Sequence, residues 1–62
     1  MFIKLTIDMK VYDEDYRVDE VVYRKGSVFM ARRNGDRFEA RTPETGRFDL
    51  DVYPEECEVV GA

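Results

Sequence analysis

The chemically versatile groups in this chain are carboxylates and arginines, because the sequence holds no histidine and only one cysteine. Five acids fall within residues 12–20 and interrupt the apolar pattern on either side. A calcium loop is excluded: counting from Asp13, the sixth position is Val18 and the twelfth is Arg24, where such loops need glycine and glutamate. A solvated loop that keeps a small protein soluble is the simplest interpretation of these acids.

A second set of charged residues is formed by arginines in the middle of the chain. They are Arg32, Arg37 and Arg41 on one outward face, with Arg33 and Arg47 near its edges. Such a cluster favours contact with phosphates, so nucleic-acid binding is an alternative hypothesis. Glu39 shares the face, and cross-strand pairs of arginine with glutamate explain the same pattern. A third hypothesis is that the acidic ends of the chain mimic a nucleic acid.

Cys57 is expected to be a small buried residue rather than a reactive thiol. No histidine is present to activate it, and the neighbouring Glu56 and Glu58 would raise the pKa of its thiol. One cysteine without histidine gives no basis for a zinc site. The sequence offers no base tuned near neutral pH and no phosphate-cradling glycine loop. We therefore expect no catalytic residues, no metal and no cofactor, and we do not expect an enzyme.

Length and composition indicate one domain spanning residues 1–62. The chain is 44% hydrophobic and 39% charged, too apolar for a disordered protein and too polar for a membrane span. Its net charge of −4 is unevenly spread: residues 24–47 carry seven Lys/Arg against three Asp/Glu, whereas residues 48–62 carry five Asp/Glu and no Lys/Arg. With no signal-peptide pattern and no cysteine pair, we expect a cytoplasmic protein without membrane contact.

Apolar and polar residues alternate with a period of two along much of the chain, which predicts strands. In residues 3–11 every second residue is apolar, which predicts one half-buried strand. Residues 12–20 predict a solvated loop or an irregular hairpin. Residues 21–23 predict a short strand that ends at a turn containing Gly26, since glycine tolerates positive φ.

The clearest local signal is Asn34-Gly35, the preferred pair at the centre of a tight hairpin turn. Centring the turn on this pair sets Ala31 opposite Phe38 on the inward face. The arginines of the hairpin then point outward.

The last part of the chain predicts a strand over residues 48–52 with Phe48 facing inward, a helical turn beginning at Pro54, and a strand over residues 58–60. Short strands joined by tight turns, with no long helix, favour a sheet that closes on itself. We predict an all-β fold, a small five-stranded barrel with one short helical turn near residues 54–57. Its expected interior is Ile3, Leu5, Ile7, Val11, Phe29, Ala31, Phe38, Ala40, Leu50 and Val52.

Two segments resemble the SH3 family and its bacterial relatives. Residues 10–13 (Lys-Val-Tyr-Asp) are similar to the Ala-Leu-Tyr-Asp-Tyr opening of eukaryotic SH3 domains. Residues 19–27 are similar to their Asp-Glu-Leu-Ser-Phe-Lys-Lys-Gly-Asp segment, and the resemblance covers about residues 10–60. It implies an SH3-like barrel, and it places the acidic stretch where SH3 domains use acids to select an arginine or lysine of a ligand.

The aromatic residues with which SH3 domains hold proline-rich peptides are absent. In this resemblance Arg37 occupies the position of the exposed tryptophan, and Cys57 that of a ligand-facing tyrosine. Glu14 occupies the position of the second tyrosine of the opening motif. Recognition of proline-rich peptides is therefore not expected. The candidate protein-binding residues are Tyr12, Asp13, Glu14, Asp15, Tyr16, Asp19, Glu20, Arg37 and Pro54.

The leading hypothesis is a non-catalytic, stand-alone protein-interaction module that binds a partner protein with a basic patch. By analogy with small phage proteins, it would act as an accessory or inhibitory factor. Val28 and Met30 also point outward and, beside Tyr12 or Tyr16, would form an apolar patch rimmed by charge, a composition typical of protein-binding surfaces. Short edge strands next to this patch leave a homo-oligomer as a further alternative.

Overall fold

The computed structural model describes the backbone of residues 1–13 and 18–62, and the side chains of those residues outside 11–21. Its elements in chain order are β1 (Phe2–Leu5), β2 (Met9–Asp13), β3 (Val18–Tyr23), β4 (Val28–Asn34), β5 (Arg37–Arg41), β6 (Phe48–Val52), the 3₁₀ turn η1 (Pro54–Glu56) and β7 (Cys57–Gly61). The predicted all-β class and the short helical turn are confirmed. No helix in the described part of the chain has the length and hydropathy needed to cross a membrane.

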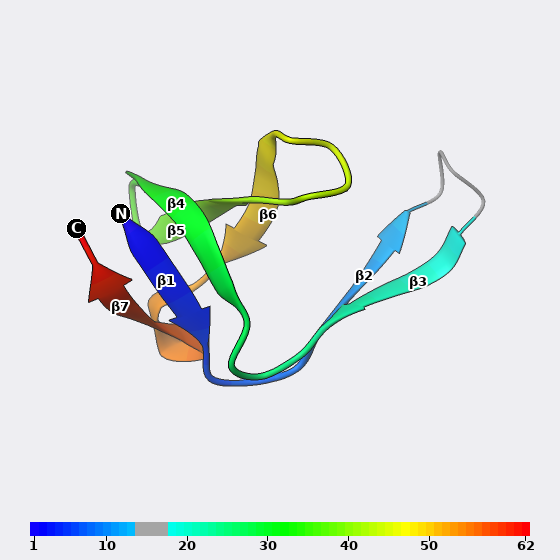
Figure 1. Cartoon of the computed structure of the whole chain (residues 1–62), viewed down its shortest axis with the longest axis horizontal. Helices are drawn as coiled ribbons and strands as arrows, with labels where there is room; N and C mark the ends of the chain where they lie inside the picture. The colour runs from blue at the N-terminus through cyan, green and yellow to red at the C-terminus, as the bar shows by residue number, and fades with distance from the viewer. Residues whose placement is uncertain (14–17) are drawn as a thin grey trace.

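Five strands form one antiparallel sheet in the order β6-β5-β4-β1-β7, and β2 pairs with β3 in a separate two-stranded hairpin. Figure 1 shows this hairpin extending away from the five-stranded sheet. The outer strands β6 and β7 are not paired with each other in the described residues, so the sheet is open at its edges. Closure into a barrel therefore stays a prediction.

Strand β4 is divided between two neighbours. Its first half pairs with β1, with Met30 opposite Phe2 and Val28 opposite Lys4. Its second half pairs with β5, in a register that begins with Ala31 opposite Ala40. Because β1 and β5 each occupy a different half of β4, the sheet can bend around one core instead of remaining flat.

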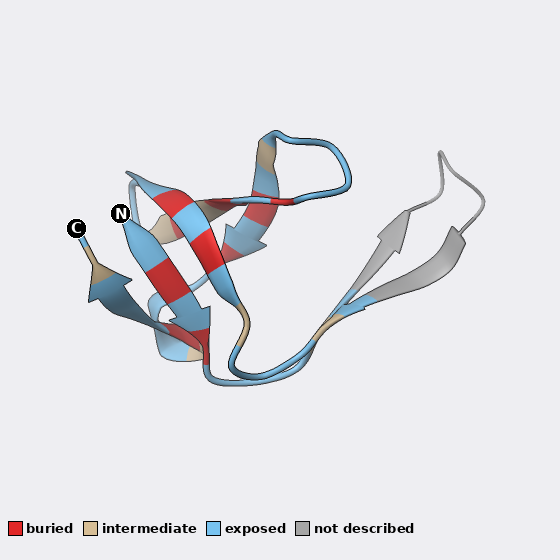
Figure 2. Ribbon diagram, viewed as in Figure 1, coloured by how far each residue is buried: buried red, intermediate tan, exposed pale blue. Residues whose placement is uncertain are grey.

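The core lies on one face of this bent sheet, and Figure 2 shows buried residues alternating with exposed ones along β1 and β4. The buried apolar side chains are Ile3, Leu5, Phe29, Ala31, Phe38, Ala40, Leu50, Val52 and Cys57. Burial of Cys57 confirms its predicted place. Ile7 was predicted inside but is 43% exposed, because β1 ends at Leu5 and the alternation does not continue through residues 6–8. The side chain of Val11 lies outside the described set.

The turn between β4 and β5 lies one residue later than predicted. Gly35 occupies its first central position with φ +64°, and Asn34 pairs with Arg37. Ala31 therefore lies opposite Ala40 instead of Phe38. A shift of two in the pairing keeps every side chain on its predicted face, since sheet faces alternate with a period of two.

Phe48 was predicted to face inward, and the structure shows the opposite. A register shift follows Ala40, which pairs with Leu50, so that Arg41 pairs with Phe48. One extra residue in a strand moves the next side chain to the other face. The Phe48 ring is half-buried on the outward face, with the guanidinium carbon of Arg32 4.9 Å from its centre.

Replacing Val52 by alanine should lower the free energy of unfolding by about 2 kcal/mol, because Val52 is fully buried and the change leaves a cavity. The same replacement at Val28, which is 54% exposed on β4, should change it by less than about 0.5 kcal/mol. Urea unfolding of both variants measures the difference. Equal losses would contradict the assignment of inward and outward faces.

Candidate functional site

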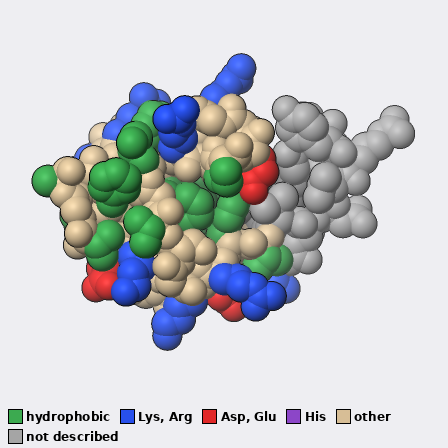
Figure 3. Space-filling model, viewed as in Figure 1, with side chains coloured by type: hydrophobic (Ala, Val, Ile, Leu, Met, Phe, Trp, Pro, Cys, Tyr) green, Lys and Arg blue, Asp and Glu red, His purple; other side chains and the backbone are tan. Residues whose placement is uncertain are grey.

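Apolar side chains lie exposed on the outward face of β1 and β4. Phe2 and Met30 are directly opposite each other in the ladder and are 41% and 44% exposed, and Val28 follows on the same face of β4. Gly61 of β7 lies against the Phe2 ring, where an added Cβ would come within 3.3 Å of Cδ2. Figure 3 shows hydrophobic side chains gathered on the viewed face over β1 and β4. We call Phe2, Val28 and Met30 the outward patch.

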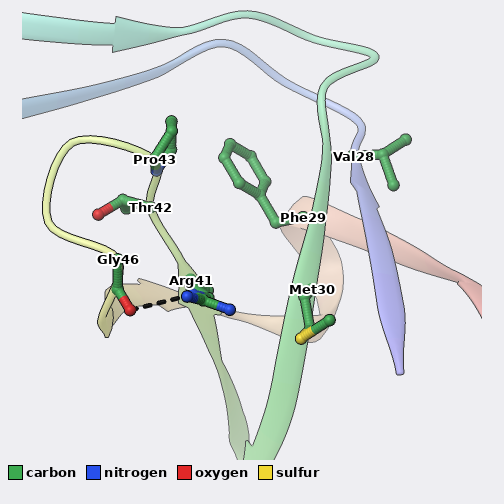
Figure 4. A pocket seen from close by; sticks show the side chains of 7 residues that line it. All are labelled: Val28, Phe29, Met30, Arg41, Thr42, Pro43 and Gly46. Atoms are coloured by element: carbon green, nitrogen blue, oxygen red, sulfur yellow. Dashed lines mark hydrogen bonds between the residues drawn. The ribbon is translucent and has the colours of Figure 1, made fainter.

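A hollow of about 390 Å³ opens beside this patch. It begins where pairing between β4 and β5 ends, because the chain leaves β5 in the turn of residues 42–47 while β4 continues along β1. Figure 4 shows the side chains around it, which are Val28, Phe29, Met30, Arg41, Thr42, Pro43 and Gly46. The hollow is mostly apolar and has one cationic group, Arg41.

The turn that forms the far wall of the hollow is held by one carboxylate. Thr42 donates a hydrogen bond to Oδ1 of Asp49 at 2.8 Å, and Thr45 donates one to Oδ2 at 2.7 Å. Partial desolvation pushes the pKa of Asp49 upward, but the hydrogen bonds from Thr45 and Thr42 outweigh it and hold the pKa below its usual value. The backbone N–H of Gly46 also donates to the carbonyl of Thr42 at 2.8 Å. The turn is therefore closed by side-chain and main-chain bonds together.

Arg41 is fixed to this turn at one end of its guanidinium group. Its Nε donates to the carbonyl oxygen of Gly46 at 3.0 Å, shown by the dashed line in Figure 4. In the same view a second guanidinium nitrogen points toward Met30. No carboxylate of the described residues forms a salt bridge with Arg41.

Tyr23 connects the β2–β3 hairpin to the turn of residues 42–47. Its hydroxyl donates to Oε2 of Glu44 at 2.7 Å, and its ring meets that of Phe29 edge to face with centres 5.3 Å apart. Burial, followed by the Glu44 carboxylate, raises the pKa of Tyr23 to about 12. At the base of the same hairpin, the backbone N–H of Lys25 donates to Oδ1 of Asp8 at 2.7 Å.

Two of the three predicted outward arginines are paired with carboxylates on the sheet. Arg32 Nε lies 2.9 Å from Oε1 of Glu39, directly across the β4–β5 ladder, and Arg37 Nε lies 3.6 Å from Oδ1 of Asp51. Only Arg41 of the three has no such partner among the residues that the structure describes. These pairs neutralise most of the face that the nucleic-acid hypothesis needs.

The two remaining arginines do not extend that face. Arg33 lies on the core side of β4, with its guanidinium carbon 5.8 Å from the centre of the Phe38 ring. Arg47 is exposed in the turn before β6, where its charge contributes to lowering the pKa of Asp49.

The predicted protein-binding residues fall in two places. Tyr12 and Asp13 belong to β2, and Asp19 and Glu20 to β3, so their backbones follow the projecting hairpin (Figure 1). Their side chains are outside the described set, and so are residues 14–16, which were predicted with them.

Arg37 and Pro54 belong to β5 and η1 and not to the projecting hairpin. Asp51, and then a hydrogen bond with Tyr53, raise the pKa of Arg37, and Pro54 follows Tyr53 as the first residue of η1. The structure therefore does not gather the whole predicted set on one surface.

Cys57 is inaccessible as a nucleophile. Its Sγ donates to the carbonyl of Tyr53 at 3.6 Å, and burial, followed by the charges of Glu56 and Glu55, raises the pKa of the thiol. In the described portion of the chain no three residues of the types His, Cys, Asp and Glu come together to hold a metal ion.

Comparison of the chain with protein-family models, with curated proteins and with solved structures finds no match.

Sequence reasoning missed Tyr23 and the threonine–aspartate bonds that position the hollow. The sequence contains a signal for these threonine–aspartate bonds. A proline- and glycine-containing turn has Thr42 and Thr45 within it and Asp49 shortly after it, and such side chains often form local hydrogen bonds around a turn. No local signal predicts the bond from Tyr23 to Glu44, since it joins residues 21 positions apart.

Replacing Asp49 by asparagine should lower the free energy of unfolding at pH 7 by about 1 kcal/mol, because the threonine hydroxyls lose a charged acceptor. The folded pKa of Asp49 is depressed, so its stabilisation is present above the unfolded pKa and is lost as pH falls through the folded pKa. Urea unfolding between pH 7 and pH 2 should therefore show the two proteins converging in acid. Asp36→Asn, a matched change in the hairpin turn, should have the same free energy of unfolding as the wild type. A difference between Asp49→Asn and the wild type that stays constant with pH would refute the role assigned to the Asp49 carboxylate.

Tyr23 should titrate near pH 12, later than an unperturbed tyrosine. Glu44→Gln removes the hydrogen-bonded carboxylate and should bring the pKa of Tyr23 down. The ring ¹³Cζ shift followed by NMR in alkali measures this directly. Glu39→Gln, which removes a carboxylate elsewhere on the sheet, should leave the value unchanged, and an equal decrease in both variants would rule out the Tyr23–Glu44 contact.

Proposed function

We propose that this chain is a non-catalytic protein-interaction module whose main contact surface is the outward patch of Phe2, Val28 and Met30. The observation that carries the proposal is the exposure of Phe2 and Met30 as a cross-strand pair. Two adjacent large apolar side chains left in water are favourably buried by a partner, at about 25 cal/mol per Å² of apolar surface. An apolar centre with a charged rim is also the composition of protein-binding surfaces.

Charged residues surround this patch as such a surface requires. Lys4, beside Phe2 on β1, lies 3.6 Å from Glu58 on β7, and Arg41 lies on the other side across the hollow. Exposed pairs of this kind contribute little to stability, so they are available to set the orientation of a partner. The patch together with its rim supports one-sided docking of a protein.

The SH3-like barrel and the basic partner belong to the same proposal. The strand order and the projecting hairpin are compatible with a sheet that wraps on itself. The resemblance over residues 10–60 supports an SH3-like form of such a barrel. In the proposal, the acids Asp13, Glu14, Asp15, Asp19 and Glu20 meet a basic patch on the partner. The carboxylates already paired with Arg32 and Arg37 weigh against nucleic acid as the alternative ligand.

Replacing both Val28 and Met30 by lysine should reduce partner recovery at least tenfold in quantitative affinity capture from extract of the native host. The loss of apolar contact at a hot spot in the centre of an interface costs about 2 kcal/mol or more, which exceeds the roughly 1.4 kcal/mol of a tenfold change. The change should leave folding intact, because both side chains are outward and exposed.

The matched control is Val59→Lys. Val59 is as exposed as Val28, but it pairs with the inward Ile3 of β1 and so lies on the opposite face of the sheet from the outward patch. It should retain the captured protein. Equal recovery with all variants would show that the outward patch is not the contact surface. Equal loss with Val59→Lys would point instead to a general effect of added charge.

A further inference from the structure

The hollow beside the outward patch contains Arg41, which forms no salt bridge with any carboxylate of the described residues. We propose that it binds an acidic segment of a partner protein, with a glutamate or aspartate side chain on Arg41 and a neighbouring apolar side chain in the hollow. This inference rests on the proposed function and specifies the partner's chemistry at one edge of the surface. The hollow is complementary in charge to such a segment, since among the described residues that line it Arg41 is charged and none is acidic.

Arg41 is oriented for this role before any partner arrives. Its Nε is committed to the carbonyl of Gly46, which leaves the two terminal nitrogens of the guanidinium group for another acceptor. Two parallel N–H donors match the two oxygens of a carboxylate, and such bidentate pairs are among the stronger hydrogen bonds in proteins. An arginine already held by its own fold loses less side-chain entropy on binding.

The orientation of Arg41 depends on the turn behind it. Asp49 accepts hydrogen bonds from Thr42 and Thr45, and Thr42 in turn accepts the N–H of Gly46 at its carbonyl. The same turn is tied to the hairpin by the bond between Tyr23 and Glu44. The Asp49 carboxylate thus holds the turn whose Gly46 carbonyl accepts the hydrogen bond from Arg41, a sequence of supports expected around a binding residue.

The apolar walls explain why a simple anion is not the expected ligand. Val28, Phe29, Met30 and Pro43 line the hollow together with Arg41. These groups gain nothing from a small hydrated ion but gain from the side chain next to an acid in a peptide. The hollow of about 390 Å³ has room for an apolar side chain beside the acid, so the expected segment places an apolar residue next to the acidic one.

The test uses the full chain and a blocked peptide, acetyl-Gly-Leu-Glu-Leu-Gly-amide, followed by ¹H–¹⁵N NMR including the arginine Nε–H signals. We expect saturable shifts confined to Arg41, Gly46 and Met30, with a Kd on the order of 1 mM, as befits a short peptide. The peptide with glutamine in place of glutamate should bind at least tenfold more weakly. This comparison leaves the protein unchanged and so does not depend on the folding of a variant.

Protein variants complete the test. Arg41→Gln should abolish the shifts, whereas Arg33→Gln, a matched change at an arginine remote from the hollow, should preserve them. Equal binding of the glutamate and glutamine peptides, equal weakening by both variants, or no shifts at 5 times that Kd would each overturn the proposal. The proposal would also be overturned if inorganic phosphate produced the same NMR shifts at the same concentration. It would likewise be overturned if sedimentation showed that the Arg41 shifts arise from self-association of the protein.

The outcome separates this inference from the proposed function. If the peptide does not bind while lysine at positions 28 and 30 still abolishes partner capture, the acidic ligand is wrong and the interaction module stands. If the peptide binds while those lysines have no effect on capture, the hollow is a site and the outward patch is not the contact surface.

Discussion

Strand β4 pairs with β1 along its first half and with β5 along its second, and both the core and the outward patch follow from this division. Residues 28–30 pair with β1 and residues 31–34 pair with β5, so one strand supplies both halves of the sheet. The inward side chains of β4, Phe29 and Ala31, therefore join core residues from both halves. The outward ones, Val28 and Met30, have only β1 beside them, since β5 has already turned away. Exposure of the patch and opening of the hollow thus have the same geometric origin.

The turn of residues 42–47 is held by hydrogen bonds of its side chains and main chain. The core of a small domain stabilises its loops only weakly, because about 40% of the surface of the unfolded chain remains exposed to water after folding. In this turn hydrogen bonds take the place of apolar packing. Asp49 accepts hydrogen bonds from two threonine hydroxyls, and Glu44 accepts one from Tyr23. These polar contacts hold Arg41 in a fixed place at low cost in apolar surface. They also join the base of the projecting hairpin to the wall of the hollow.

Local pattern was sufficient to predict most of the sheet but not its irregularities. Alternation identified Ile3, Leu5 and Val52 as core residues, because a half-buried strand imposes a period of two. The same rule failed for Phe48, since a register shift opposite Ala40 and Arg41 depends on the partner strand and leaves no mark in a single sequence. It failed for Ile7 because the strand ended early. The candidate site was predicted only at Val28 and Met30; the hollow and Tyr23 arise from contacts between distant segments.

In our proposal the outward face of β1 and β4 meets a partner protein. Oxidation by dilute hydrogen peroxide, followed by mass spectrometry at each methionine, distinguishes this face from the core, because Met30 is exposed on it whereas Met9 packs against the core. In the free protein Met30 should oxidise faster than Met9, and in the captured complex Met30 alone should be protected. Slow oxidation of free Met30, or a complex in which its rate is unchanged, would contradict the claim.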